Sequence, residues 1–370
     1  MRLTVVNVAF PFAPVTRDPV GGAEQVLAHL DRALVAAGNQ SIVVAAEGSD
    51  TAGRLVAIPH EAEPSSERAR LRTYDAVRDA LGQLLRKEAV DVVHLHGVDF
   101  HAYLPPAGRP VLVTLHLPLA WYPERALNSR RADTWLLPVS QAQADSANAK
   151  VRLLPPIRNG VEMRARLDVK KRRFAFMLGR ICPEKGFHEA LVAAKRADVP
   201  LLLAGVVFPW AEHERYFETE IRTRLDAQRR WIGRVTGARK HRLIAAASCL
   251  LVPSLANETS SLVAMESLAA GTPVIAYNRG ALPEIVEHGV TGYIVRDAVE
   301  MADAIRAIDR ISSEACRRAA RERFSLERSM AGYLQLYAKL SGSARSVAAS
   351  QDGHRLRAGL DGQMGEPALP

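Results

Sequence analysis

Short apolar runs alternate along this chain with longer segments whose apolar residues recur at helical spacing. The runs are rich in β-branched residues and predict buried strands, whereas amphipathic segments such as 25–37 and 66–87 predict helices. The strands predicted in the first half are 3–9, 41–46, 54–58, 91–95, 111–115 and 134–140. Strands that alternate with helices at this spacing are typical of a parallel, doubly wound α/β sheet.

The second half repeats this alternation. Its predicted strands are 174–179, 200–205, one that ends at 231–235, 249–253 and 273–277. The most regular stretch is 249–295, in which a polar loop leads from a strand into a helix at 262–270. Gly271 and Pro273 stop that helix, and a long charged helix is also predicted at 210–225.

Repetition of the pattern over 370 residues predicts two domains, each with its own core. The expected divisions are a first domain at 1–162, a basic linker at 163–173, a second domain at 174–325, a helix at 326–340 and a tail at 341–370. The tail is rich in Ser, Ala, Gly, Arg and Asp, so we expect it to be disordered.

The net charge of +9 favours anionic partners, namely a nucleotide diphosphate, an acidic membrane surface or nucleic acid. The linker contributes Arg164, Arg166, Lys170, Lys171, Arg172 and Arg173. The simplest interpretation of the linker is a solvated hinge. The alternative with a functional meaning is that the linker makes peripheral contact with an anionic membrane. A second basic cluster at 229–242 is expected to lack interleaved exposed aromatic residues, which argues against nucleic acid.

Three cysteines, Cys182, Cys249 and Cys316, are widely spaced and odd in number. This usage is typical of a reducing compartment and predicts neither a disulfide framework nor a zinc site. No apolar run approaches the roughly 18 residues of a membrane span, and the chain begins directly with a strand rather than a signal peptide. We therefore expect a cytoplasmic protein.

Polar residues at the carboxyl ends of the predicted strands are candidates for ligand binding, because ligands of doubly wound sheets lie beyond those ends. His94, His96 and His116 occupy such positions. A metal site of His94, His96 and nearby His101 is not favoured, since no carboxylate or cysteine accompanies them at ligand spacing. His116 either donates a hydrogen bond to a ligand or only caps its strand.

Two loops carry residue types that suit phosphate. Gly21 and Gly22 follow the first strand and open a helix, although the G-x-G-x-x-G fingerprint is absent and a tight turn also explains them. Arg180 and Lys185 lie five residues apart after the strand at 174–179 and would converge readily on a diphosphate. The alternative for both cations is a surface ion pair with Glu184.

Two carboxylates frame the start of the helix at 262–270. Glu258 lies at the tip of the preceding loop, and Glu266 lies eight residues later, close to two helical turns away. Such carboxylates accept hydrogen bonds from sugar and ribose hydroxyls. The plainer interpretation is that Glu258 is a charge at the start of the helix and that Glu266 is a solvated helix position. Residues 259–261 are expected to cap the helix, whose free amides attract anions.

These motifs, taken in order, resemble glycosyltransferase family 4. The order is Pro253-Ser254, Glu258 and Glu266, Gly271-Thr272-Pro273-Val274-Ile275-Ala276, and Glu284-Ile285-Val286 with Gly289, Thr291 and Gly292. The resemblance implies the GT-B fold, in which two Rossmann-like, doubly wound parallel-sheet domains face a central cleft. The first domain would bind the acceptor and the second the nucleotide sugar, and the last helix would return to the first domain.

The resemblance also implies roles for single residues. Glu266 would bind the ribose, Glu258 would contact the transferred sugar, and His116 would face the reacting sugar. Arg180 and Lys185 would neutralise the leaving diphosphate. The implied catalytic set is His116, Arg180, Lys185 and Glu258, and the implied donor-binding set is Gly21, Gly22, Arg180, Lys185, Arg234, Val235, Glu258, Thr259, Ser260, Ser261, Leu262 and Glu266.

One departure concerns the run Thr259-Ser260-Ser261, where many family members have a Gly-Phe-Gly-like run, and it leaves the preferred sugar open. The expected activity is a retaining transfer from a nucleoside diphosphate sugar, most commonly a UDP-sugar, to a glycan, small-molecule or lipid-linked acceptor. No D-x-D triplet occurs in the chain, so we expect no cofactor and no metal requirement. An idle nucleotide-sugar-binding regulator and a GT-B-like nucleotide-sugar epimerase are the alternatives.

Overall fold

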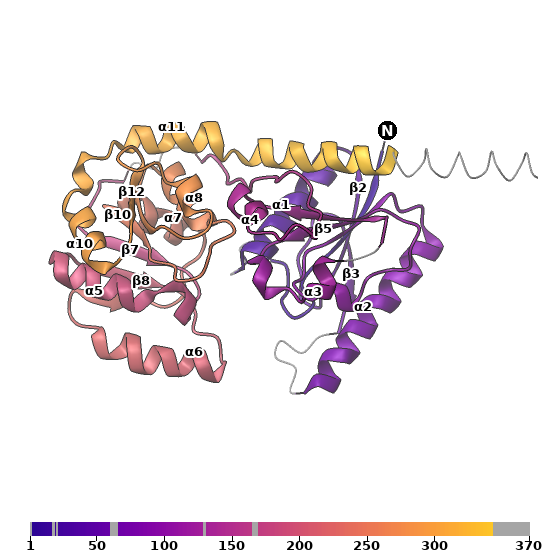
Figure 1. Ribbon diagram of the computed structural model, residues 1–370, viewed down its shortest axis with the longest axis horizontal. Coiled ribbons are helices and arrows are strands. Elements are labelled where there is room, and N and C mark those ends of the chain that lie inside the picture. The colour runs from indigo at the N-terminus through magenta and orange to yellow at the C-terminus, as the bar shows by residue number, and fades with distance from the viewer. Residues whose placement is uncertain are drawn as a thin grey trace, which may run out of the picture.

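The computed structural model describes residues 2–16, 19, 21–59, 66–128, 131–164 and 169–342. It contains two six-stranded sheets, one in each half of the chain, and their paired strands are all parallel. The strand orders are β3-β2-β1-β4-β5-β6 and β12-β11-β10-β7-β8-β9. Each order reverses between the first and fourth strands of its sheet, which is the doubly wound arrangement. The predicted fold is confirmed, and Figure 1 shows the two domains side by side.

The first domain is built on strands close to their predicted positions. The strands are β1 (Thr4–Val8), β2 (Gln40–Ala46), β3 (Arg54–Ile58), β4 (Val92–Leu95), β5 (Val111–Leu115) and β6 (Thr134–Pro138). The helices are α1 (Gly22–Ala36), α2 (Glu67–Lys87), α3 (Glu124–Leu127) and α4 (Gln141–Asp145), with 3₁₀ turns at Phe100–Ala102 and Leu119–Trp121. Ser66 caps α2, because its side chain accepts a hydrogen bond from the Ala69 amide.

The second domain repeats the pattern. Its strands are β7 (Ala175–Leu178), β8 (Leu201–Ala204), β9 (Arg229–Trp231), β10 (Cys249–Val252), β11 (Val274–Tyr277) and β12 (Gly292–Val295). Its α-helices are α5 (Phe187–Ala197), α6 (Ala211–Tyr216), α7 (Gly237–Ala246), α8 (Leu262–Ala269), α9 (Leu282–Ile285), α10 (Ala298–Arg306) and α11 (Ser313–Arg323). Turns of 3₁₀ type lie at Pro183–Lys185, Arg222–Arg224 and Ile308–Arg310.

Two predictions about this domain are wrong in detail. The helix expected at 210–225 is regular only in α6, which continues into a π-helical turn at Phe217–Ile221. Tyr216, Phe217 and Ile221 are all buried, and the wider turn keeps them on the core side. The strand expected at 231–235 is β9, which ends earlier because the backbone turns at Gly233 with φ +71°.

The central strands β1, β2, β4 and β5 of the first sheet are buried on both faces along almost their whole length, which explains why they are largely apolar. Successive residues of β1 point to opposite faces: Val6 and Val8 pack in one apolar cluster, and Val5 packs in another. The cluster around Val5 includes Tyr333 and Tyr337 from the helical segment 326–342. Figure 1 shows this segment, in yellow, running from the second domain along the first.

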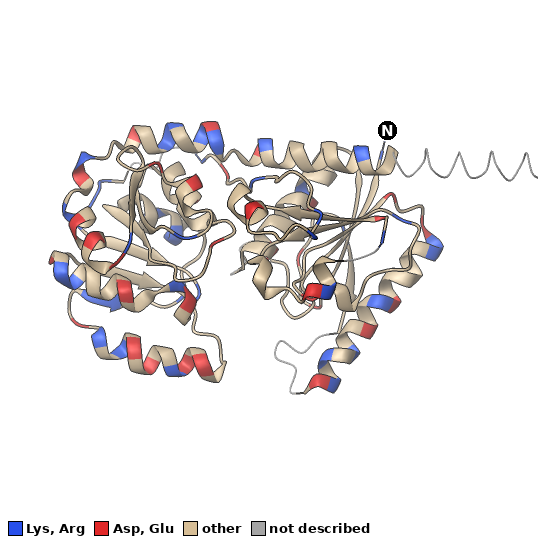
Figure 2. Ribbon diagram, in the orientation of Figure 1, with Lys and Arg blue, Asp and Glu red and all other residues tan. Residues whose placement is uncertain are grey.

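Acidic and basic residues are interspersed along α2 and α6, so neither helix carries charge of one sign alone (Figure 2). Part of the linker is attached to the second domain, since the Lys171 ammonium donates to the Ala247 carbonyl at 3.0 Å. Residues 165–168 of the linker and 343–370 of the predicted tail lie outside the described residues. In the part of the chain that the structure describes, no helix has the length and apolar character needed to span a bilayer.

Candidate active site

The two domains meet at the carboxyl ends of their strands. Glu284 of α9 accepts hydrogen bonds from the Gln141 and Ala142 amides at the start of α4, at 3.3 and 2.5 Å. Arg158 adds a contact to the same carboxylate at 3.4 Å. The Thr259 hydroxyl donates across the interface to the His116 carbonyl at 2.8 Å. Thr259, which is predicted to bind the donor, thus contacts His116, which is predicted to face the reacting sugar.

Lys185 and Glu258 form an ion pair in the second domain. The Lys185 ammonium lies 2.6 Å from Glu258 Oε1, and the two side chains are 35% and 10% exposed. The Ser254 hydroxyl donates to the same carboxylate oxygen. The partner of Lys185 is thus Glu258 rather than Glu184, so the plain surface-pair interpretation is wrong.

A glycine sets the position of Lys185. Gly186 follows it with φ +68°, and a Cβ at that residue would lie 2.1 Å from the Pro253 carbonyl oxygen. Only glycine fits both the left-handed backbone and this close approach. The turn therefore brings the Lys185 loop against the strand end that precedes Glu258.

Arg180 lies beyond β7 and contacts two aromatic rings. Its guanidinium carbon lies 5.6 Å from the ring centre of Phe208 and 5.8 Å from that of Trp210. Within the described residues Arg180 has no ion-pair partner, so its hydrogen-bond donors are available to an anion. Such a planar fork suits phosphate oxygens.

Glu24 was not predicted as a site residue, yet it lies where the first domain approaches Arg180. Burial raises the pKa of the Glu24 carboxyl, and the Arg180 charge acts in the opposite direction. Glu24 also crowds Gly21, since a Cβ there would meet its carboxylate. The glycine pair thus makes room for an acidic side chain, and Gly22 lies against Leu262, 3.5 Å from a Cβ built on it.

Glu266 lies on α8, and the neighbours of its carboxylate all contact one oxygen, Oε1. Lys240 of α7 lies 3.0 Å from Oε1, and Gln25 of the first domain donates to Oε1 at 3.1 Å. No other described residue contacts Oε2, which stays available to a ligand hydroxyl. Because the side chain is only 12% exposed, the interpretation as a solvated helix position is wrong.

The start of α8 differs from the expected cap. Ser261 occupies the N-cap position, but its side chain makes no capping hydrogen bond. Thr259 is engaged with His116, and the buried Ser260 hydroxyl has no partner among the described residues. The first-turn amides of α8 are therefore not satisfied by these side chains, which favours an anion at this end.

The two residues predicted to contact the base lie differently. Arg234 is exposed, whereas the Val235 side chain is buried in the core of the second domain. A ligand contact through the Val235 side chain would require that side chain to leave the core. The predicted contacts of Arg234 and Val235 with the base stay predictions.

The three histidines at the ends of β4 and β5 form a connected group. His96 Nδ1 lies 3.1 Å from His116 Nε2, and the rings of His94 and His96 have centres 4.0 Å apart. Burial lowers the pKa of His116 to about 4 and holds the pKa values of His94 and His96 well below their usual range. All three are therefore neutral at pH 7.

A group that offers metal ligands arises elsewhere, from Cys182, Glu184 and His213, whose donor atoms lie within 4.8 Å of one another. Sequence spacing did not reveal it because the three residues come from two separate elements. Each of them experiences the Arg180 charge, which opposes a bound cation. The three cysteines are free and buried.

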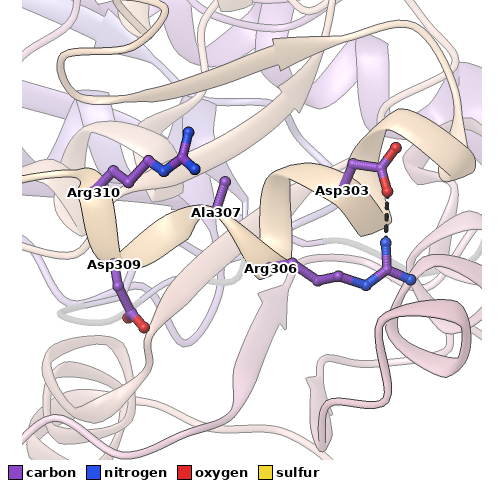
Figure 3. A pocket seen from close by; sticks show the side chains of 5 residues that line it. All are labelled: Asp303, Arg306, Ala307, Asp309 and Arg310. Atoms are coloured by element: carbon purple, nitrogen blue, oxygen red, sulfur yellow. Dashed lines mark hydrogen bonds and ion pairs between the residues drawn. The ribbon is translucent and has the colours of Figure 1, made fainter.

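A hollow on the second domain contains none of the predicted residues. It is lined by Asp303, Arg306, Ala307, Asp309 and Arg310, with an ion pair of 2.5 Å between Asp303 and Arg306 (Figure 3). Its opposed charges leave it without a dominant sign. The interdomain residues, by contrast, combine two cations, a helix start and two carboxylates.

Comparisons with known proteins identify the family and the fold. The family model described as Glycosyltransferase Family 4 matches residues 20–162, and that described as Glycosyl transferases group 1 matches residues 161–326. A phosphatidyl-myo-inositol mannosyltransferase of Mycobacterium leprae is 25% identical over 340 residues, which cover 80% of this chain and 85% of that protein.

Solved structures share the fold. AviGT4, a glycosyltransferase involved in avilamycin A biosynthesis, superposes with a TM-score of 0.67 at 25% identity, covering 92% of this chain and 98% of that chain. HepE of Anabaena, solved with UDP and glucose, has a TM-score of 0.67 at 17% identity, covering 91% of this chain and all of that chain (100%). The second likeness is one of fold alone.

Proposed function

This chain belongs to glycosyltransferase family 4 and is a glycosyltransferase of the GT-B type, and from that premise we propose that it transfers a sugar from a nucleoside diphosphate with retention of configuration. The observation that carries the proposal is the ion pair of Lys185 with Glu258, shortly before the start of α8, together with Arg180, whose charge acts on Cys182 as that of Lys185 does. A leaving diphosphate is the anion that this combination suits.

Charge on the leaving group determines the chemistry. As the bond from sugar to phosphate breaks, negative charge grows on the diphosphate, and fixed donors aimed at that charge lower the barrier. Arg180 supplies a planar fork and Lys185 a compact charge. Glu258 holds Lys185 in place through Oε1, and its other oxygen faces the transferred sugar in our proposal.

Retention ordinarily requires a carboxylate nucleophile beneath the sugar. We propose instead a front-face attack, in which the acceptor hydroxyl enters on the side that the diphosphate leaves. The departing phosphate oxygen takes the acceptor proton as the new glycosidic bond forms. The chain then contributes orientation and electrostatic stabilisation rather than a covalent intermediate.

Two further parts of the proposal concern partners. Catalysis proceeds without a metal ion, because two cations and a helix start supply the positive charge that a divalent ion would otherwise bring. UDP is the nucleotide we propose, supported by the complex of HepE with UDP and glucose. A lipid-linked acceptor, met at the cytoplasmic face of a membrane, is supported by the name of the mannosyltransferase relative and by the basic linker.

Donor binding can be tested before any acceptor is known. We expect one nucleotide sugar from a panel built on UDP, GDP, ADP and dTDP to raise the melting temperature selectively, in the presence of EDTA. Binding that stabilises only the folded state raises it in proportion to the logarithm of ligand concentration. Stabilisation that disappears in EDTA would contradict metal independence, and a flat response to the whole panel would contradict the donor site.

A further inference from the structure

The group of histidines between the domains contains one polar atom without a partner. His96 Nδ1 lies 3.1 Å from His116 Nε2, but His96 Nε2 is buried and unpaired among the described residues. His116 is partly exposed, and no described residue contacts its Nδ1. The two rings therefore share one hydrogen bond. Of their remaining nitrogens, His96 Nε2 is buried without a partner, whereas Nδ1 belongs to the partly exposed His116.

A neutral imidazole carries one proton, so the shared hydrogen bond couples the two tautomers. If His116 donated through Nε2–H, His96 would carry its own proton on Nε2, where a buried N–H would have no acceptor. If His96 donates through Nδ1–H, only an unpaired lone pair remains on Nε2. Orphaned buried donors are rarer in proteins than under-satisfied acceptors, so the second arrangement is favoured.

We propose that His96 is a positioning residue that holds His116 in the Nδ1-protonated tautomer, so that His116 presents an N–H donor to a hydroxyl of the bound sugar. His116 then has Nε2 occupied as an acceptor and Nδ1–H directed to the accessible side. Because only the proposed function brings a sugar to His116, the part of the proposal that concerns the sugar rests on that function.

The helical segment 326–342 contacts the histidine group through His94. His94 Nδ1 lies 2.7 Å from the Tyr337 hydroxyl, and His94 Nε2 lies 2.8 Å from the Thr114 hydroxyl. The ring of His94 packs against His96 at 4.0 Å between centres. Residues 326–342 thus fix His94, His94 limits the movement of His96, and His96 sets the proton on His116.

The test uses the full chain with ¹⁵N-labelled histidine. Long-range ¹H–¹⁵N correlation spectra, with His116 assigned by the His116→Asn variant, report which ring nitrogen carries the proton. We expect a protonated Nδ1 and an unprotonated Nε2 in the wild type. A protonated Nε2 on His116 would overturn the proposal whatever the enzyme's activity.

Variants separate positioning from folding. His96→Phe keeps a ring beside His94 but removes the hydrogen bond, so His116 should become a mixture of tautomers and the turnover number should fall about tenfold with little change in KM. His96→Asn, whose amide reaches the position of Nδ1, should restore both. His101→Asn is the matched control, because His101 contacts neither His96 nor His116 among the described residues.

The outcomes are distinguishable from failure of the proposed function. An unchanged His116 spectrum in a folded His96→Phe protein would overturn the positioning role. The expected tautomer together with no transfer from any nucleotide sugar would leave the positioning role standing and contradict the proposed function. Circular dichroism of each variant shows whether the fold is retained.

Discussion

Replacement of Lys185 by alanine is expected to lower the turnover number by about ten- to thousandfold, because the leaving diphosphate loses a fixed positive charge. The structure adds a second reason. Glu258 is only 10% exposed and lies 2.6 Å from Lys185, so the variant leaves a poorly solvated carboxylate without its cation, close to the incoming donor. Steady-state kinetics with the donor from the panel measures the change.

Three variants separate these two reasons. Lys185→Arg keeps the charge and should lose less than alanine does. Lys185→Ala combined with Glu258→Ala should recover part of the loss only if repulsion from Glu258 causes it. Lys195→Ala, an exposed lysine on α5, is the control and should be neutral. Turnover of Lys185→Ala near that of the wild type would refute the role of Lys185, and Arg180→Ala should lose activity over a similar range.

Replacement of Glu266 by glutamine is expected to weaken donor use by about 10- to 100-fold in kcat/KM, since a hydrogen bond to a charged group contributes about 1.5–3 kcal/mol. Both neighbours of Glu266, Lys240 and Gln25, contact Oε1, which leaves Oε2 for the ribose. The loss should appear mainly in KM, because the ribose is bound alike before and during the reaction.

Donors that contain deoxyribose test whether Glu266 binds a ribose hydroxyl. The wild type should discriminate against a donor that lacks the ribose hydroxyl bound by Glu266, and Glu266→Gln should lose most of that discrimination, which a double-mutant cycle measures. Gln25→Ala removes a neighbour but leaves the carboxylate, so it should keep the discrimination. Equal discrimination by wild type and Glu266→Gln would show that Glu266 does not bind the ribose.

The fold was predictable from the sequence because strands and helices differ in how their apolar residues are spaced along the chain. Central strands such as Val111–Leu115 and Cys249–Val252 are buried along their whole length, so they are apolar except at Thr114. The sequence failed where periodicity was ambiguous. The residues after Tyr216 have a helical pattern, yet only the structure shows the π-helical turn that keeps Tyr216 and Phe217 both buried.

The sequence could propose site residues only where a motif carries local chemistry. Arg180, Lys185 and Glu258 lie in loops that follow strands, and Glu266 lies inside the helix that follows one of these loops, so their neighbourhood in the sequence marks them. Their partners were missed, because contacts such as Gln25 with Glu266 join residues 241 positions apart.

A second kind of omission concerns groups that burial creates. Glu24 has an ordinary place in the first turn of α1, and only the packing of the domains shows that its pKa is raised and that Arg180 is near. The contact of Tyr337 with His94, which leads to the His96–His116 pair, likewise joins residues 243 positions apart. Spacing alone gives no signal for such contacts.

The stereochemistry of slow donor hydrolysis tests the central claim most directly, since it needs no acceptor. The nucleotide sugar selected by the thermal panel is incubated with the enzyme, and the anomer of the first sugar released is read by ¹H NMR before mutarotation. Front-face chemistry predicts that this sugar keeps the anomeric configuration that it had in the donor. Release of the inverted anomer would contradict the mechanism proposed for this glycosyltransferase.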